Sequence, residues 1–195
     1  MSTALGDRAA DNLRFIRETM ARAGAFTSVS GSGMILVGIM GLAATIVAPP
    51  AIIAASPSEF LAVWIGAALL GGPISWLMIR RKATRAGQSL LDGPARRFTL
   101  AFAPGLAAGA ILTLAFIAAR QTSLLPGTWL TLYGASVTAG GALSVKPVPI
   151  MGALFIVLGA VCFFVPPFVQ SILLAAGFGG LHLLFGYHIT RHYGG

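Results

Sequence analysis

The chain has 195 residues, of which 56% are hydrophobic and 9% are charged, and its formal net charge is +8. Soluble domains carry about 25% charged residues, so this composition argues against a water-soluble fold and favours a protein whose main solvent is a lipid bilayer. Cys162 is the only cysteine, which excludes a disulfide within the chain.

Residues 1–30 are the only sizeable polar segment, and we expect them to form an N-terminal cytoplasmic amphipathic helix ahead of a transmembrane domain at 31–195. The apolar residues recur at helical spacing and form one stripe: Ala9, Leu13, Ile16, Met20 and Ala23. This pattern favours a helix lying on the inner membrane surface. The alternative is a docking helix, residues 9–23, for a soluble partner or a second copy of the chain.

Apolar runs with no acidic or basic residue in their middle fill the rest of the chain. Each run has about 18 to 25 residues, which is enough for a helix to cross a hydrocarbon core of about 30 Å. We therefore predict an all-α polytopic membrane protein with six transmembrane helices, at Gly31–Ala55, Phe60–Ile79, Phe98–Ala119, Leu124–Val145, Val148–Val165 and Val169–Ile189.

The basic residues predict the orientation of these spans. If the spans alternate in direction, 12 of the 13 Lys and Arg residues fall on one side and only Arg120 falls on the other. The positive-inside rule then predicts a bacterial-type inner membrane protein with both termini in the cytoplasm. This distribution accounts for the net charge without nucleic-acid binding. We expect the cytoplasmic loop between spans two and three to contact anionic lipids through Arg80, Arg81, Lys82, Arg85, Arg96 and Arg97.

A weak internal repeat predicts that the spans form three tandem hairpins. At or just before the start of the second span of each pair, a proline is followed 13 or 14 residues later by two adjacent glycines. Glycine lets helix backbones approach closely, so we expect helix packing at Gly71, Gly72, Gly105, Gly109, Gly140, Gly141, Gly179, Gly180 and Gly186.

His182 is the only ionisable residue deep inside an apolar run, and such a residue is by default a functional candidate. One neutral imidazole is also tolerated in so apolar a helix when a neighbouring hydroxyl bonds it. We favour this structural interpretation, with Thr131 or Thr138 of the fourth span as the partner. The alternative is a role in binding a ligand or handling protons.

His188 and His192 lie four residues apart near the end of the last span, a spacing that suits a divalent metal. Two ligands do not complete a site, and we favour an interfacial belt with the neighbouring tyrosines. Haem held by two histidines requires them on facing helices, whereas all three histidines of this chain lie on one predicted helix. We therefore predict no cofactor and keep haem or a divalent metal as a minor alternative.

Catalytic constellations are missing from the sequence: no carboxylate lies within a predicted span, and no motif such as HExxH, GxSxG or CxxC occurs. We therefore predict no catalytic residue. The leading hypothesis is a non-catalytic membrane subunit that binds a protein partner or lipid. A transporter or channel for a neutral or apolar small solute is the first alternative, and a haem- or metal-binding protein is the second.

Overall fold

The computed structural model describes residues 11–16, 20, 24, 26–87, 89–90 and 93–193. These residues form helices joined by turns, and none of them belongs to a strand. The helices are α2 (Gly31–Val47), η1 (Pro50–Ala54), α3 (Pro57–Arg85), α4 (Gly93–Ala118), η2 (Thr122–Leu124), α5 (Leu125–Gly141), α6 (Pro147–Cys162), α7 (Pro167–Leu174), η3 (Ala175–Leu181) and α8 (His182–Tyr193).

The elements α7, η3 and α8 follow one another without a break and form a single 27-residue helix, Pro167–Tyr193, called the last helix below. Its middle section, η3, is a π-helix, in which each backbone hydrogen bond spans five residues instead of the four of an α-helix, so the turn is wider. The section contains Gly177, Gly179 and Gly180, and glycine adapts its backbone more readily than other residues. Wide turns of this kind recur at functional sites.

Among the described residues, three helices are long and apolar enough to cross a membrane: α3, α4 and the last helix. Only 6% of the most apolar stretch of α4 is buried within the protein, so its apolar side chains require a nonpolar environment outside the chain. Two further apolar helices, α2 and α6, have 17 and 16 residues and fall short of that length. The prediction of an all-helical membrane protein is thus supported for the described residues, whereas six spans are not confirmed.

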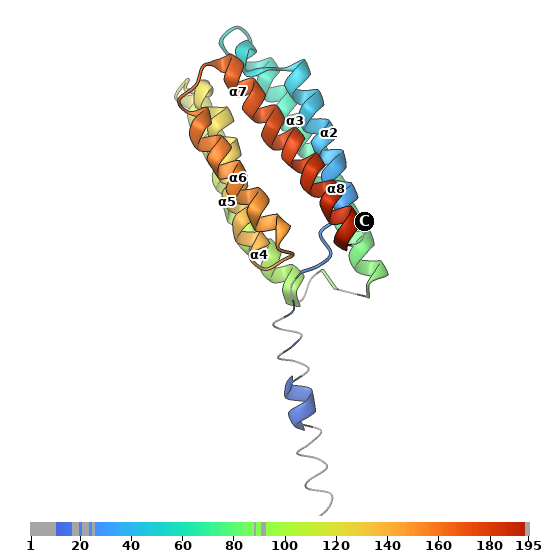
Figure 1. The fold of residues 1–195 in the computed structure, drawn as a ribbon. Coiled ribbons are helices and arrows are strands. Elements are labelled where there is room, and N and C mark those ends of the chain that lie inside the picture. Colours follow the sequence, from blue (N-terminus) through green and yellow to red (C-terminus); the bar gives the residue numbers. More distant parts are fainter. Residues whose placement is uncertain are drawn as a thin grey trace, which may run out of the picture.

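The helices form two groups of three, which Figure 1 shows side by side. In one group α2 packs against both α3 and the last helix, and in the other α5 packs against both α4 and α6. The predicted tandem hairpins are not confirmed. The pairs α2–α3 and α4–α5 are in contact, but α6 packs mainly on α5, and the last helix packs mainly on α2.

Aromatic side chains fill the boundary between the two groups. Phe60 of α3 stacks on Trp129 of α5 with ring centroids 5.5 Å apart, and Trp64 lies 5.6 Å from Phe178 of the last helix. We call this layer the aromatic seam and define it by Phe60, Trp64, Trp129, Tyr133, Phe155 and Phe178. Bulky rings fill this boundary, and Gly177 of the last helix also lies close to Leu130 of α5 across it.

One end of the seam is covered by residues 26–30, which we call the N-terminal wedge. The Phe26 N–H donates to the Leu143 carbonyl at 2.8 Å, and the Ser144 hydroxyl donates to the Phe26 carbonyl at 2.6 Å. Phe26 also packs on Phe98 of α4, with ring centroids 5.0 Å apart. The wedge leads directly into α2, so it ties the α2 group to the α4–α6 group. This is the wedge end of the bundle; the opposite end is the cavity end.

Candidate functional site in the aromatic seam

His182 lies in the aromatic seam with only 2% of its surface exposed. Its Nε2 atom is 2.6 Å from the hydroxyl oxygen of Tyr133 on α5. The Phe155 ring packs edge-on against the imidazole at 5.4 Å, and the Phe178 ring lies nearly parallel to it at 6.3 Å. The histidine and the tyrosine therefore form a polar pair enclosed by apolar rings, and this pair joins the two helix groups.

The second ring nitrogen of His182, Nδ1, is buried and has no hydrogen-bond partner among the residues that the structure describes. Gly177 and Phe178, in the wide turn of η3, lie five and four residues before His182, but no carbonyl group of the described residues is hydrogen-bonded to this atom. When the Tyr133 hydroxyl donates to Nε2, the imidazole proton resides on Nδ1. The imidazole thus has one nitrogen atom bonded to Tyr133 and one that is buried and unpaired among the described residues.

The hydrogen-bond partner of His182 is Tyr133 and not the predicted Thr131 or Thr138. The Thr131 and Thr138 hydroxyls each donate to a backbone carbonyl four residues earlier, at 2.8 Å. Both threonines lie against glycines of α6, Thr131 against Gly159 and Thr138 against Gly152. A side-chain carbon on either glycine would collide with the threonine. A tyrosine in the middle of an apolar run needs a partner for its hydroxyl, and this was the signal that could have identified Tyr133.

The other two histidines lie at the exposed end of α8. Their rings stack with centroids 4.4 Å apart, and Nδ1 of His192 is hydrogen-bonded to the His188 carbonyl at 2.9 Å. The Arg191 guanidinium lies over the ring of Tyr187 at 5.8 Å. Within the described part of the chain, no three His, Cys, Asp or Glu residues gather as metal ligands.

The predicted packing glycines differ in how closely their surroundings approach. A side-chain carbon at Gly140, Gly141 or Gly186 would lie 2.7–3.1 Å from its nearest neighbouring atom. Such a carbon would also collide with Ser136 at Gly105 and with Leu42 at Gly179. Gly71, Gly109 and Gly180 have only ordinary contacts, and Gly72 has no atom within 4 Å. Equally close contacts surround glycines that were not predicted: Gly31, Gly38, Gly41, Gly127, Gly134, Gly152, Gly159 and Gly177.

Of the six basic residues expected to contact lipid, Lys82 has a further role. Its Nζ donates to the Val29 carbonyl at 3.0 Å and to the Tyr193 carbonyl at 2.9 Å. Lys82 therefore joins α3, the N-terminal wedge and the end of α8. The other five are exposed, as lipid contacts require: Arg80, Arg81, Arg85, Arg96 and Arg97.

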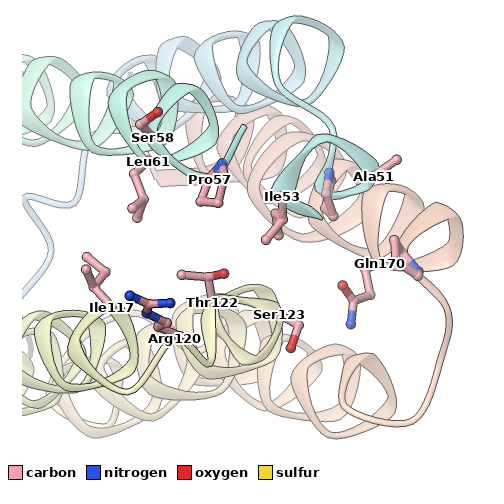
Figure 2. Close-up of a pocket in the computed structure, with 12 residues that line it drawn as sticks. Ala51, Ile53, Pro57, Ser58, Leu61, Ile117, Arg120, Thr122, Ser123 and Gln170 are labelled. Carbon is pink, nitrogen blue, oxygen red and sulfur yellow. The ribbon is translucent and has the colours of Figure 1, made fainter. Parts of the chain in front are cut away.

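A cavity of about 610 Å³ opens at the cavity end, between the two helix groups (Figure 2). Arg120 and Thr122 lie on one side of it, and Pro57, Leu61 and Ile53 face them from the other side. Gln170, at the start of the last helix, also lines the cavity and donates to the Cys162 carbonyl at 3.1 Å. The cavity thus combines apolar walls with a few polar groups, as small-molecule sites do.

Comparison with protein-family models, curated proteins and solved structures finds no match. The class of the protein therefore follows from the fold alone. In the part of the chain that the structure describes, it has helices and no strands, with three helices that could cross a membrane and two helix groups around an aromatic seam.

Proposed function

We propose that the chain crosses a bacterial-type inner membrane six times, with both termini in the cytoplasm. The direction of the helices supports this topology. The end of α3, the loop between α5 and α6 and the end of α8 all lie near the N-terminal wedge. The starts of α3 and α7 and the segment after α4 surround the cavity. Successive helices therefore run in alternate directions between the same two ends.

The shorter helices are compatible with this topology. At 1.5 Å per residue, α2, α5 and α6 are about 25 Å long, against a hydrocarbon core of about 30 Å. A mismatch of this size is accommodated by local thinning of the bilayer at modest cost. In this orientation the wedge end is cytoplasmic, and Arg120 at the cavity end is the one basic residue outside.

Accessibility labelling from each side of intact cells tests the topology, which fails if residues 20 and 193 face opposite compartments.

We further propose a non-catalytic function, in which the N-terminal helix docks the protein to a soluble partner or to lipid. Exposed apolar side chains carry this proposal. Leu13, Ile16 and Met20 are 62%, 50% and 70% exposed, and their spacing of three and four residues places them on one helix face. In Figure 1 the short helix of residues 11–16 lies apart from the bundle. Ala9 and Ala23, the ends of the predicted stripe, lie outside the described residues.

The test compares the full chain with a triple variant, Leu13→Ser, Ile16→Ser and Met20→Ser, in pull-down and crosslinking from membranes. The matched control is Phe15→Ser, which removes an apolar side chain that is 65% exposed and lies off the stripe. Loss of a bound protein in the triple variant alone supports docking to a partner. Loss of contact between this helix and photoreactive lipids supports docking to the membrane. An unchanged set of partners and lipid contacts refutes the proposal.

A second candidate function is transport of a neutral or apolar small solute, and the seam favours it. Two helix groups separated by a side-chain layer, open at one end and covered by the wedge at the other, resemble carriers in which two bundles rock about a central site. Light-scattering assays on proteoliposomes, with a panel of neutral solutes, test it. Solute-dependent swelling no faster than in empty liposomes refutes it.

An absorption spectrum and metal analysis of the same preparation test the haem or metal alternative.

A further inference from the structure

Arg120 has a backbone conformation that its residue type rarely adopts. Its φ angle is 57°, in the left-handed region, and it is the only non-glycine residue of the described chain with a positive φ. The Gln121 N–H donates to the Phe116 carbonyl at 2.8 Å, and the Arg120 N–H donates to the Ile117 carbonyl at 3.1 Å. This pair of bonds is the Schellman motif, which ends helices and usually has glycine at the position that Arg120 occupies.

Arginine at this position strains the backbone, whereas glycine would satisfy the same motif without strain. The helix end therefore does not account for the choice of residue. A strained residue of this kind points to a role for its side chain. The Arg120 side chain lines the cavity between the helix groups (Figure 2), so the cavity is the place to look for that role.

The electrostatic surroundings of Arg120 favour an anion. Among the described residues, its guanidinium has neither an ion-pair nor a hydrogen-bond partner. Glu59 lies in the first turn of α3 but does not line the cavity. Residues at the N-terminal ends of α3 and α7, Pro57 and Pro167, do line it. The N-terminal end of a helix carries a partial positive charge and favours anions.

The remaining walls of the cavity favour an apolar body attached to that anion. Ile53, Leu61 and Ile117 line it together with three prolines. The volume of about 610 Å³ lies within the range of sites for drug-sized ligands. The hydroxyls of Thr122 and Ser123, which follow closely after Arg120, are additional donors for an anionic oxygen.

We propose that this cavity binds an amphiphilic anion, with a carboxylate or phosphate group on the Arg120 guanidinium and an apolar chain against Ile53, Leu61 and Ile117. Arginine suits such a group because its planar fork can donate two parallel hydrogen bonds to it. The site goes beyond the proposed docking function and does not depend on it. In the proposed topology the cavity opens to the extracytoplasmic side, where the ligand enters either from water or from the outer lipid leaflet.

The experiment measures binding of decanoate and of decanol to the full-length protein in nanodiscs of zwitterionic lipid. The variant Arg120→Gly removes the guanidinium while supplying the residue that the helix end prefers. We expect decanoate binding to weaken about tenfold or more, because a hydrogen-bonded charge pair is lost. Decanol binding and the arrangement of the helices should not change, and the melting temperature should stay the same or rise. Arg96→Gly, at the wedge end, is the control for loss of one positive charge.

The source of the anion is identified by repeating the measurement in nanodiscs that contain phosphatidylglycerol. If phosphatidylglycerol competes with decanoate in the wild type but not in Arg120→Gly, a lipid phosphate is an occupant of the site. If phosphatidylglycerol does not compete in the wild type, the occupant is a free carboxylate. Equal decanoate affinity of the wild type and Arg120→Gly overturns the proposal. So does decanol binding as tight as that of decanoate to the wild type.

Discussion

Replacing Tyr133 with phenylalanine removes one hydroxyl and leaves its ring packing in place. Tyr133 packs against Phe155, Phe178 and His182 with centroid distances of 4.9, 5.3 and 5.4 Å, and a phenylalanine ring retains all these contacts. The 2.6 Å bond to His182 Nε2 is lost. Because Nδ1 already lacks a partner among the described residues, Tyr133→Phe leaves the buried imidazole without a side-chain hydrogen bond.

We expect Tyr133→Phe to lower the free energy of unfolding by about 1–2 kcal/mol, the usual cost of leaving a buried polar group unpaired. Side-chain hydrogen bonds between membrane helices contribute about 0.6 kcal/mol on average, and the expected cost is larger because the imidazole is left buried and unpaired. His182→Phe should cost a similar amount, because it leaves the tyrosine hydroxyl unpaired. The double variant replaces the polar pair with two rings in a layer of rings. It should therefore be more stable than the sum of the two single changes predicts.

Reversible unfolding in mixed SDS and detergent micelles gives the free energies of unfolding of the wild type, the two single variants and the double variant. The double-mutant cycle then isolates the energy of the pair, which we expect to be about 1 kcal/mol. Additivity within about 0.3 kcal/mol would show that the two side chains do not stabilise each other, and would refute the structural role given to this pair.

Three further predictions concern the packing of the helices and the wedge end. Gly186→Ala would place a carbon 2.8 Å from a backbone oxygen of α2, so we expect a loss of about 1–3 kcal/mol in the SDS assay. The control Gly72→Ala, with open space around it, should be neutral or stabilise by up to about 1 kcal/mol, and equal effects of both changes would contradict the helix pairing. Lys82→Met removes two hydrogen bonds to carbonyl groups and should lower the free energy of unfolding by about 1–2 kcal/mol. The control Arg85→Met, at an exposed position, should lower it by less than about 0.5 kcal/mol. Similar values for the two variants would show that the Lys82 bonds do not hold α3, the wedge and α8 together. Phe26→Ala should increase amide hydrogen exchange throughout the N-terminal wedge, since a buried ring that anchors it is lost, and unchanged protection would show that the wedge is held by other contacts.

The sequence identified His182 because an ionisable residue stands out in an apolar run. Its partner was missed because that choice depends on how α5 is rotated about its axis. Tyr133 lies two residues after Thr131, which is about 200° around a helix of 3.6 residues per turn. The two side chains therefore face opposite directions: Thr131 faces α6, and Tyr133 faces the seam. Hydrophobic runs fix the position of a helix in the chain but not its rotation.

The sequence also did not show which helices lie next to each other. Glycines recur in nearly every apolar run, so their spacing does not show which faces meet. Gly152 and Gly159 are seven residues apart on one face of α6, and they receive Thr138 and Thr131 of α5. Gly71 and Gly72 were also among the predicted packing glycines, yet the structure leaves ordinary contacts or open space around them. Arg120 was recognised only as the exception to the charge pattern, since residue type alone does not reveal its left-handed backbone.

The pairing of α2 with the last helix constrains how the chain can be assembled during synthesis. Gly31, Gly38 and Gly41 of α2 receive the backbone or side chains of Gly186, Leu183 and Phe178. Translation makes α2 before its main partner by more than a hundred residues. In the proposed topology, α2 must therefore remain in the bilayer, with its glycine-lined surface covered by lipid or by the insertion machinery, until the last helix is synthesised. A ribosome that stops before residue 167 would release α4, α5 and α6 as a paired unit but would leave α2 without its main partner.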